Sequence, residues 1–181
     1  MSRYSADGKV QKVLGGDGDG PGQLSSPRQV SLDRQGNVYV SDWGHDRIVK
    51  FSPDGNLLGQ FGTSGSDTGQ IHLPAGIAVA ADGSMFVADS DNRRVLKLAP
   101  DGTPLEQYPA CATPGDCGVM PGSEIGQFSE HSSLSIDGQG NLYVADTGNN
   151  RIQRRIVVEV PNQLADTGQS DRRALGASDP G

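Results

Sequence analysis

An eleven-residue stretch occurs three times in this chain of 181 residues, as Val38–Ile48, Met85–Val95 and Leu142–Ile152. Each copy contains alternating apolar residues, then an Asp, four loop residues and an Arg. The first two copies start 47 residues apart and the last two 57, so an insertion of ten residues separates the last two. A repeat unit of this size cannot bury its apolar face alone, and neighbouring units must therefore stack.

The alternation of apolar residues predicts four short strands in each unit. We expect them at 29–33, 37–41, 47–52 and 56–61 in the first unit, and at 76–80, 84–88, 94–99 and 103–108 in the second. Asp-Gly pairs such as Asp54-Gly55 and Asp137-Gly138 supply the positive φ that tight turns require. Four-stranded antiparallel sheets repeated at this period are the blades of a β-propeller. The predicted fold class is all-β.

The residue pattern of each unit resembles the NHL repeat. In the first unit the resemblance rests on Gly22-Gln23-Leu24 with Pro27, on the stretch Asp33–Asp42, and on Arg47-Ile48. It extends from residue 4 to about residue 156. The resemblance implies an NHL-type propeller, which in that family usually has six blades.

Residues 1–160 are predicted to form three blade equivalents, half of a six-bladed ring. Blades are expected at 29–61, 76–108 and 133–156, with a strand at 10–14 belonging to a preceding blade. Two explanations stay open: further NHL blades in a longer chain, or a homodimer whose two halves close one ring. Residues 161–181 are polar and aperiodic, which predicts a disordered tail or linker.

In such a blade, the loop between the second and third strands (the BC loop) and the crossover to the next blade lie at the same end. We call this end the loop face. It combines the variable residues with the one long insertion, and loops on a rigid scaffold commonly carry function. The candidate binding residues on it are Arg28, Trp43, His45, His72, Asn92, His131 and Asn149.

An Asp and an Arg bracket the BC loop in every unit, as Asp42 and Arg47, Asp89 and Arg94, and Asp146 and Arg151. A functional interpretation would make them ligand contacts. A feature present in every blade is better explained by the fold, so each Asp is expected to cap its loop and each Arg to pair with it. We therefore predict a structural role.

Both cysteines, Cys111 and Cys117, lie in the ten-residue insertion. A metal site would need two further ligands, so the pair predicts a disulfide. A disulfide in turn favours an oxidising compartment, secreted or periplasmic.

The three histidines raise the question of a metal site. The peptidyl-amidoglycolate lyases, whose repeat is similar, bind zinc through histidines just after the crossover proline. Here those positions hold Arg28, Ala75 and Ser132, so the lyase pattern is not met. The stretch 16–20 looks faintly like a calcium loop but lacks the later acidic ligand. We predict no metal, no cofactor and no catalytic residue.

The formal charge of −7 argues against nucleic acid as a partner, although some NHL propellers bind RNA through a basic face. No apolar run approaches the roughly 18 residues of a membrane helix. The predicted function is a non-catalytic binding or scaffold module whose loop face meets a protein or peptide. The alternative is part of a metal-dependent propeller enzyme, similar to a peptidyl-amidoglycolate lyase or a lactonase.

Overall fold

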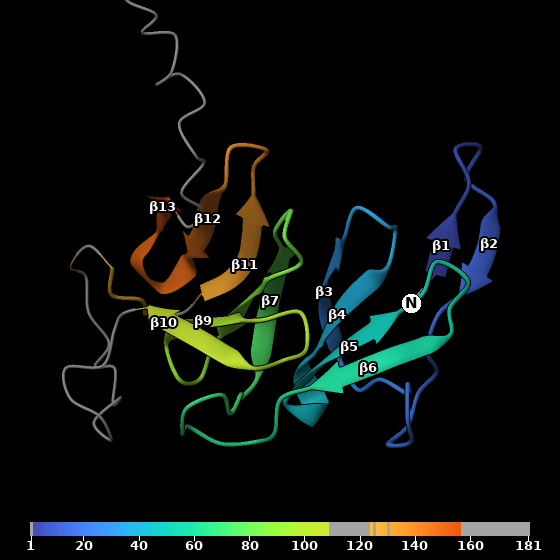
Figure 1. Cartoon of the computed structure of the whole chain (residues 1–181), viewed down its shortest axis with the longest axis horizontal. Helices are drawn as coiled ribbons and strands as arrows, with labels where there is room; N and C mark the ends of the chain where they lie inside the picture. The colour runs from blue at the N-terminus through green and yellow to red at the C-terminus, as the bar shows by residue number, and fades with distance from the viewer. Residues whose placement is uncertain (1, 109–123, 125, 130, 157–181) are drawn as a thin grey trace, which may run out of the picture.

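A computed structural model of the chain describes residues 2–108, 124, 126–129 and 131–156. Within these residues it contains 13 strands in four antiparallel sheets, which follow one another around an arc (Figure 1). The all-β, propeller-type prediction is confirmed. The insertion with Cys111 and Cys117 and the predicted tail at 161–181 lie outside the described residues, and the disulfide therefore remains a prediction without structural support.

The first two complete blades have the same order of strands. The first runs β3 (Pro27–Leu32), β4 (Val38–Asp42), β5 (Arg47–Phe51) and β6 (Leu57–Phe61), and the second runs β7 (Pro74–Val79), β8 (Met85–Asp89), β9 (Arg94–Leu98) and β10 (Pro104–Tyr108). Each strand pairs with the next one in sequence. Gly at φ near +80° to +89° closes the β3–β4, β5–β6, β7–β8 and β9–β10 hairpins, whereas the BC loops end in Asp46 and Arg93 at φ of +54° and +53°.

The two ends of the arc hold smaller sheets. The third blade contains β11 (His131–Ile136), β12 (Asn141–Asp146) and β13 (Arg151–Ile156), and the first sheet contains β1 (Ser2–Tyr4) and β2 (Val10–Val13). The sequence predicted only the second strand of that first sheet. In the third blade, Gly140 rather than Gly138 adopts positive φ, at +82°, because it takes the position of Gly36 in the first hairpin.

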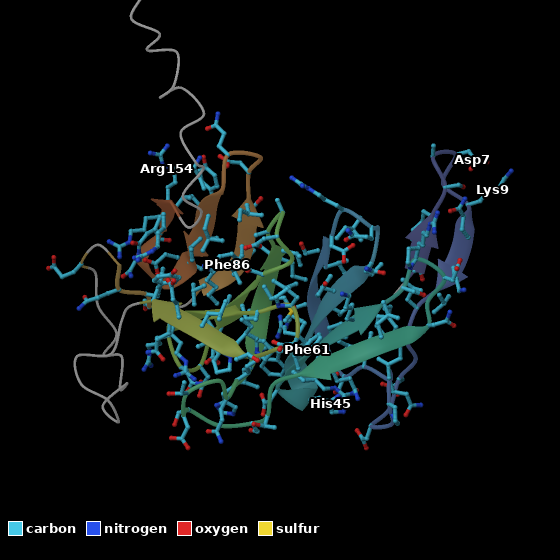
Figure 2. All side chains as sticks on the ribbon, viewed as in Figure 1. Asp7, Lys9, His45, Phe61, Phe86 and Arg154 are labelled. Carbon is cyan, nitrogen blue, oxygen red and sulfur yellow. The ribbon has the colours of Figure 1, made fainter. Side chains whose placement is uncertain are left out.

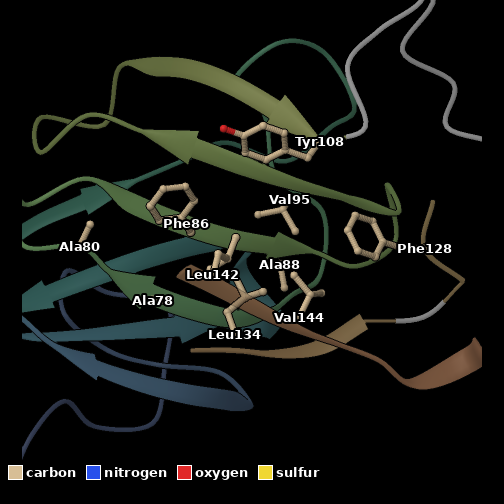
Figure 3. Packing of buried hydrophobic residues seen from close by; sticks show 10 residues of the cluster. All are labelled: Ala78, Ala80, Phe86, Ala88, Val95, Tyr108, Phe128, Leu134, Leu142 and Val144. Carbon is tan, nitrogen blue, oxygen red and sulfur yellow. The ribbon is translucent and has the colours of Figure 1, made fainter. Parts of the chain in front are cut away.

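The apolar core lies between successive blades, as the repeat requires. Tyr39, Ile48 and Phe61 of the first blade pack against Ile77, Met85 and Leu96 of the second. A second cluster joins the second blade to the third through Phe86, Val95, Tyr108, Leu134 and Leu142 (Figure 3). A third, including Leu14, Val40 and Phe51, covers the first blade on its other side.

Two short 3₁₀ turns occupy BC loops, η1 (Trp43–His45) in the first blade and η2 (Thr147–Asn149) in the third. None of the described helices is long and apolar enough to cross a membrane.

Candidate functional site

The loop face is held together by the repeated Asp residues. Asp42 accepts a hydrogen bond from the backbone N–H of Ser25 at 2.7 Å, and Asp89 accepts one from His72 N–H at 2.7 Å. In the third blade, Ser129 N–H donates to Asp146 at 3.1 Å. Each donor belongs to the crossover that enters the blade. Crossovers and BC loops therefore share one end of the molecule, where Figure 2 labels His45, opposite the hairpin of Asp7 and Lys9.

Each repeated Arg extends the same network. Its Nε donates to the Asp of its own blade, at 2.9 Å for Arg47 and 2.7 Å for both Arg94 and Arg151. Its terminal nitrogens donate to crossover carbonyls, and Arg94 reaches three of them, at Ser66, Asp67 and Gln70. All three Asp side chains are fully buried. The Asp–Arg pairs thus join loop, blade and crossover, and their geometry is that of a scaffold.

Three candidate binding residues occupy one equivalent position in the repeat. His45, Asn92 and Asn149 each lie three residues after the Asp of their blade. His45 Nδ1 is 2.8 Å from Asp42, while Asn92 and Asn149 donate to Asp89 and Asp146 at about 3 Å. Their polar groups are committed to the scaffold, which leaves less of them for a partner.

His45 differs from the two Asn residues because it has a second nitrogen. Nε2 lies 2.9 Å from Asp19, a crossover residue whose side chain is 98% exposed. The hydrogen bond with Asp19, together with the one to Asp42, raises the pKa of His45 above its ordinary value of 6.5. The protonated ring bridges two carboxylates and ties the crossover to the loop.

This bridge predicts a pH-dependent part of the stability. Because the pKa of His45 is raised on folding, its contribution is fully present below about pH 6.5 and is lost as pH rises through the folded value. His45→Asn introduces the residue found in the other two blades, so it should keep a hydrogen bond to Asp42 and remove the fall in stability with rising pH. The denaturant midpoint of unfolding, measured from pH 6 to 8, shows this fall. Asp19→Asn should also reduce the change of the midpoint with pH. An equal change in the unmodified chain, His45→Asn and Asp19→Asn would contradict the role assigned to His45.

Arg28 and Trp43 form the feature of the loop face that the other described blades do not repeat. The Arg28 guanidinium carbon lies 4.8 Å from the centroid of the Trp43 ring. Arg28 is exposed and Trp43 is partly buried, and no hydrogen bond or ion pair joins the Arg28 side chain to a described residue. The equivalent positions hold Ala75 and Ser90 in the second blade, and Ser132 and Thr147 in the third. A flat ring under a guanidinium with exposed N–H groups can bind a carboxylate and an apolar group together.

The base of this pair is fixed by a close approach of loop and crossover. Gly44 N–H donates to the Ser25 carbonyl at 2.9 Å. A Cβ on Gly44 would lie only 2.4 Å from Ser25 Oγ, so a side chain at position 44 would push the loop away. Glycine here keeps Trp43 in place beside the crossover.

The remaining candidates are less constrained. His72 Nδ1 lies 2.8 Å from Asp91, and both side chains are substantially exposed, at 40% and 57%. His131 begins β11, with its Cα opposite that of Asp146 in the sheet register. The side chain of His131 lies outside the described part of the chain. Within that part, no group of three or more His, Cys, Asp or Glu side chains could hold a metal ion.

Gln29 is a structural residue that the sequence analysis missed. Its carboxamide donates to the Leu134 carbonyl at 2.7 Å and accepts from Leu134 N–H at 3.1 Å, joining the first blade to the third. Gly76 of β7 lies between them, where an added Cβ would be 3.0 Å from Gln29 Oε1. The sequence does contain a sign of this role, because Gln29 is a long polar residue at a position that holds the small residues Gly76 and Ser133 in the other units.

Comparison with solved structures places this geometry in a known class. A structural genomics protein of unknown function from Bacteroides thetaiotaomicron has a TM-score of 0.62 at 20% identity, with 84% of this chain covering 41% of that one. A streptogramin B lyase structure gives 0.58 at 18% identity (84% and 43%), and a luciferin-regenerating enzyme 0.55 at 16% (82% and 44%). The chain thus spans less than half the length of these proteins, and it folds as a β-propeller segment.

The NHL repeat family model matches residues 132–154, in the third blade. The chain thus contains an NHL repeat, within a stack of antiparallel sheets of the β-propeller type. No curated protein sequence gives a significant match.

Proposed function

We propose that the chain is a non-catalytic NHL binding module whose loop face meets a protein or peptide partner. The observation that carries this is the Arg28–Trp43 pair, a partly exposed cation–π contact present in one blade of three. Trp and Arg are the residue types most enriched among interface hot spots. Trp43 lies in the BC loop and Arg28 near the start of β3, beside the crossover that the buried Asp42–Arg47 network holds, so a partner would bind a pre-ordered surface at a low entropic cost.

The partner we favour is a peptide segment with an acidic residue next to an apolar one. The carboxylate would take the exposed N–H groups of Arg28, and the apolar group would lie against Trp43. His45, Asn92 and Asn149 would shape this surface without supplying its main contacts, because their polar groups already bond to buried Asp residues.

Peptides selected from a random library on the full chain would test this proposal. Arg28→Ala and Trp43→Ala should each weaken the selected peptides by at least about tenfold, the size expected of a hot spot. Trp43 is the one Trp in the chain, so its fluorescence reports binding at this place. Arg34→Ala, which removes an exposed Arg from a hairpin at the opposite end, is the matched control. Equal affinities for all variants would refute the proposed surface.

A metal-dependent propeller enzyme of the peptidyl-amidoglycolate lyase or lactonase kind is the second candidate. Its support is the fold, since a lyase and a luciferin-regenerating enzyme are among the structural relatives. Stoichiometric zinc or calcium in the purified protein would favour this candidate over the binding module. The oligomeric state is a separate part of the proposal. Light scattering in solution would distinguish a homodimer that closes the ring from a single copy of the chain.

A further inference from the structure

The third blade differs from the other two at its outer edge. β6 pairs with β5 and β10 pairs with β9, so the first two blades each have a fourth strand. β13 stands where β5 and β9 stand, at the edge of its sheet, and no described strand pairs with its other side (Figure 1). An unpaired edge presents a row of backbone donors and acceptors to an extended peptide.

Three crossover glycines show how much space this edge leaves. Gly22, Gly69 and Gly126 are equivalent, with φ of +73°, +80° and +89°. A Cβ on Gly22 would lie 3.7 Å from Leu57, and one on Gly69 would lie 3.0 Å from Pro104. Leu57 and Pro104 are the first residues of β6 and β10. A Cβ on Gly126 would meet no described atom within 4 Å, so no described residue takes the place of a fourth strand there.

A hollow of about 320 Å³ lies at the same place, between the second and third blades. Its apolar wall includes Val95, Tyr108 and Phe128 of the cluster in Figure 3. Its rim is formed by Gln153, Arg154 and Arg155. Two of these replace core residues, since Leu96 and Leu98, at the positions of Gln153 and Arg155, are buried between the first two blades. Polar side chains therefore stand here where the interface between the first two blades has buried leucines.

The charges along the edge indicate what would bind there. In the second blade, Lys97 of β9 lies 3.8 Å from Glu106 of β10, and the two residues are opposite each other in the register. Arg154 takes the position of Lys97 on β13 and points outward at the surface (Figure 2). Arg155 is also exposed and stacks on Tyr108, 3.8 Å from its ring centroid. A strand with an acidic residue opposite Arg154 therefore complements this edge.

The residues that follow β13 are poorly suited to this role by sequence. The turn from β9 to β10 places Gly102 at φ +89°, a left-handed conformation that favours glycine. The same position after β13 holds Glu159. A strand supplied by a partner protein needs no such turn, so no residue other than glycine has to adopt the left-handed conformation.

We propose that the outer edge of β13 is a peptide-docking site that takes an extended, acidic segment of a partner protein as the fourth strand of the third blade. Backbone pairing with β13 supplies affinity, Arg154 selects the acidic residue, and the hollow over Tyr108 takes an apolar side chain. This site lies on the third blade, away from the Arg28–Trp43 pair of the first blade, so it goes beyond the binding function proposed above.

A fluorescein-labelled peptide of residues 102–108, the sequence of β10 and its turn, is the probe. Anisotropy with the full chain should show saturable binding, since β9 and β13 are equivalent strands. Arg154→Glu should weaken binding roughly fivefold, and a peptide with Lys in place of the Glu should regain it on that variant. Arg34→Glu makes the same charge change elsewhere and should have no effect. N-methylation of alternate peptide nitrogens should abolish binding, because it removes strand pairing.

Three results would overturn the proposal. The first is that the full chain fails to bind the peptide, which would mean that its own residues cover the edge. The second is that neither Arg154→Glu nor N-methylation changes the affinity. The third is that the peptide dissociates a dimer in light scattering, which would make a second copy of the chain the occupant.

Discussion

Asp89→Ala is expected to destabilise the chain by about 3–5 kcal/mol, the cost of breaking a buried ion pair by removing one partner. Asp89 is fully buried, and the Arg94 side chain is 1% exposed. Burial raises the pKa of Asp89, while bonds from His72 N–H, Asn92 and Arg94 act in the opposite direction. Loss of the carboxylate would leave the Arg94 charge buried and would release the crossover at His72.

Denaturant unfolding monitored by circular dichroism measures this loss. Asp91→Ala is the matched control, because Asp91 lies in the same loop but is exposed and pairs only with the exposed His72. We expect the control to stay within about 0.5 kcal/mol of the unmodified chain. If Asp89→Ala and Asp91→Ala have similar midpoints, the repeated Asp–Arg pairs do not hold the loop face.

Phe86→Ala is expected to cost a similar amount, about 3–5 kcal/mol, for a different reason. The Phe86 side chain is fully buried and belongs to the cluster that joins the second and third blades (Figure 3). Its removal loses apolar burial and leaves a cavity that strands on both sides cannot easily collapse into. The two blades should therefore lose part of their shared stability.

The same unfolding measurement tests this second prediction. Leu105→Ala removes an apolar side chain of the same blade that is 51% exposed, and should cost less than about 1 kcal/mol. A small loss for Phe86→Ala would show that the blades do not depend on packing against each other. That result would contradict the stacked arrangement itself.

Strand positions were predictable because their signals are local. The expected strand at 37–41 is β4 at Val38–Asp42, and the one at 103–108 is β10 at Pro104–Tyr108. Alternating apolar residues and turn glycines act within a few residues, so the repeat reproduces them in each unit. Alignment of the three copies also identifies the Asp–Arg pairs.

Contacts between units were harder to predict. Gln29 reaches Leu134 because the arc brings β3, β7 and β11 next to one another, and no local pattern encodes this. The bridge from His45 to Asp19 likewise depends on how a crossover folds back over a loop. The Arg28–Trp43 contact joins two predicted candidates, but its geometry needed the fold.

We propose that the repeated Asp and Arg residues hold the loop face rigid and that Arg28 and Trp43 are the residues on it that contact a partner. Amide hydrogen exchange on the free chain tests the first half most directly, residue by residue. The amides of Ser25, His72 and Ser129 lie in crossovers, yet each donates to a buried Asp. We predict that they exchange nearly as slowly as the strand amides. Exchange as fast as that of the exposed hairpin around Gly8 would contradict the account.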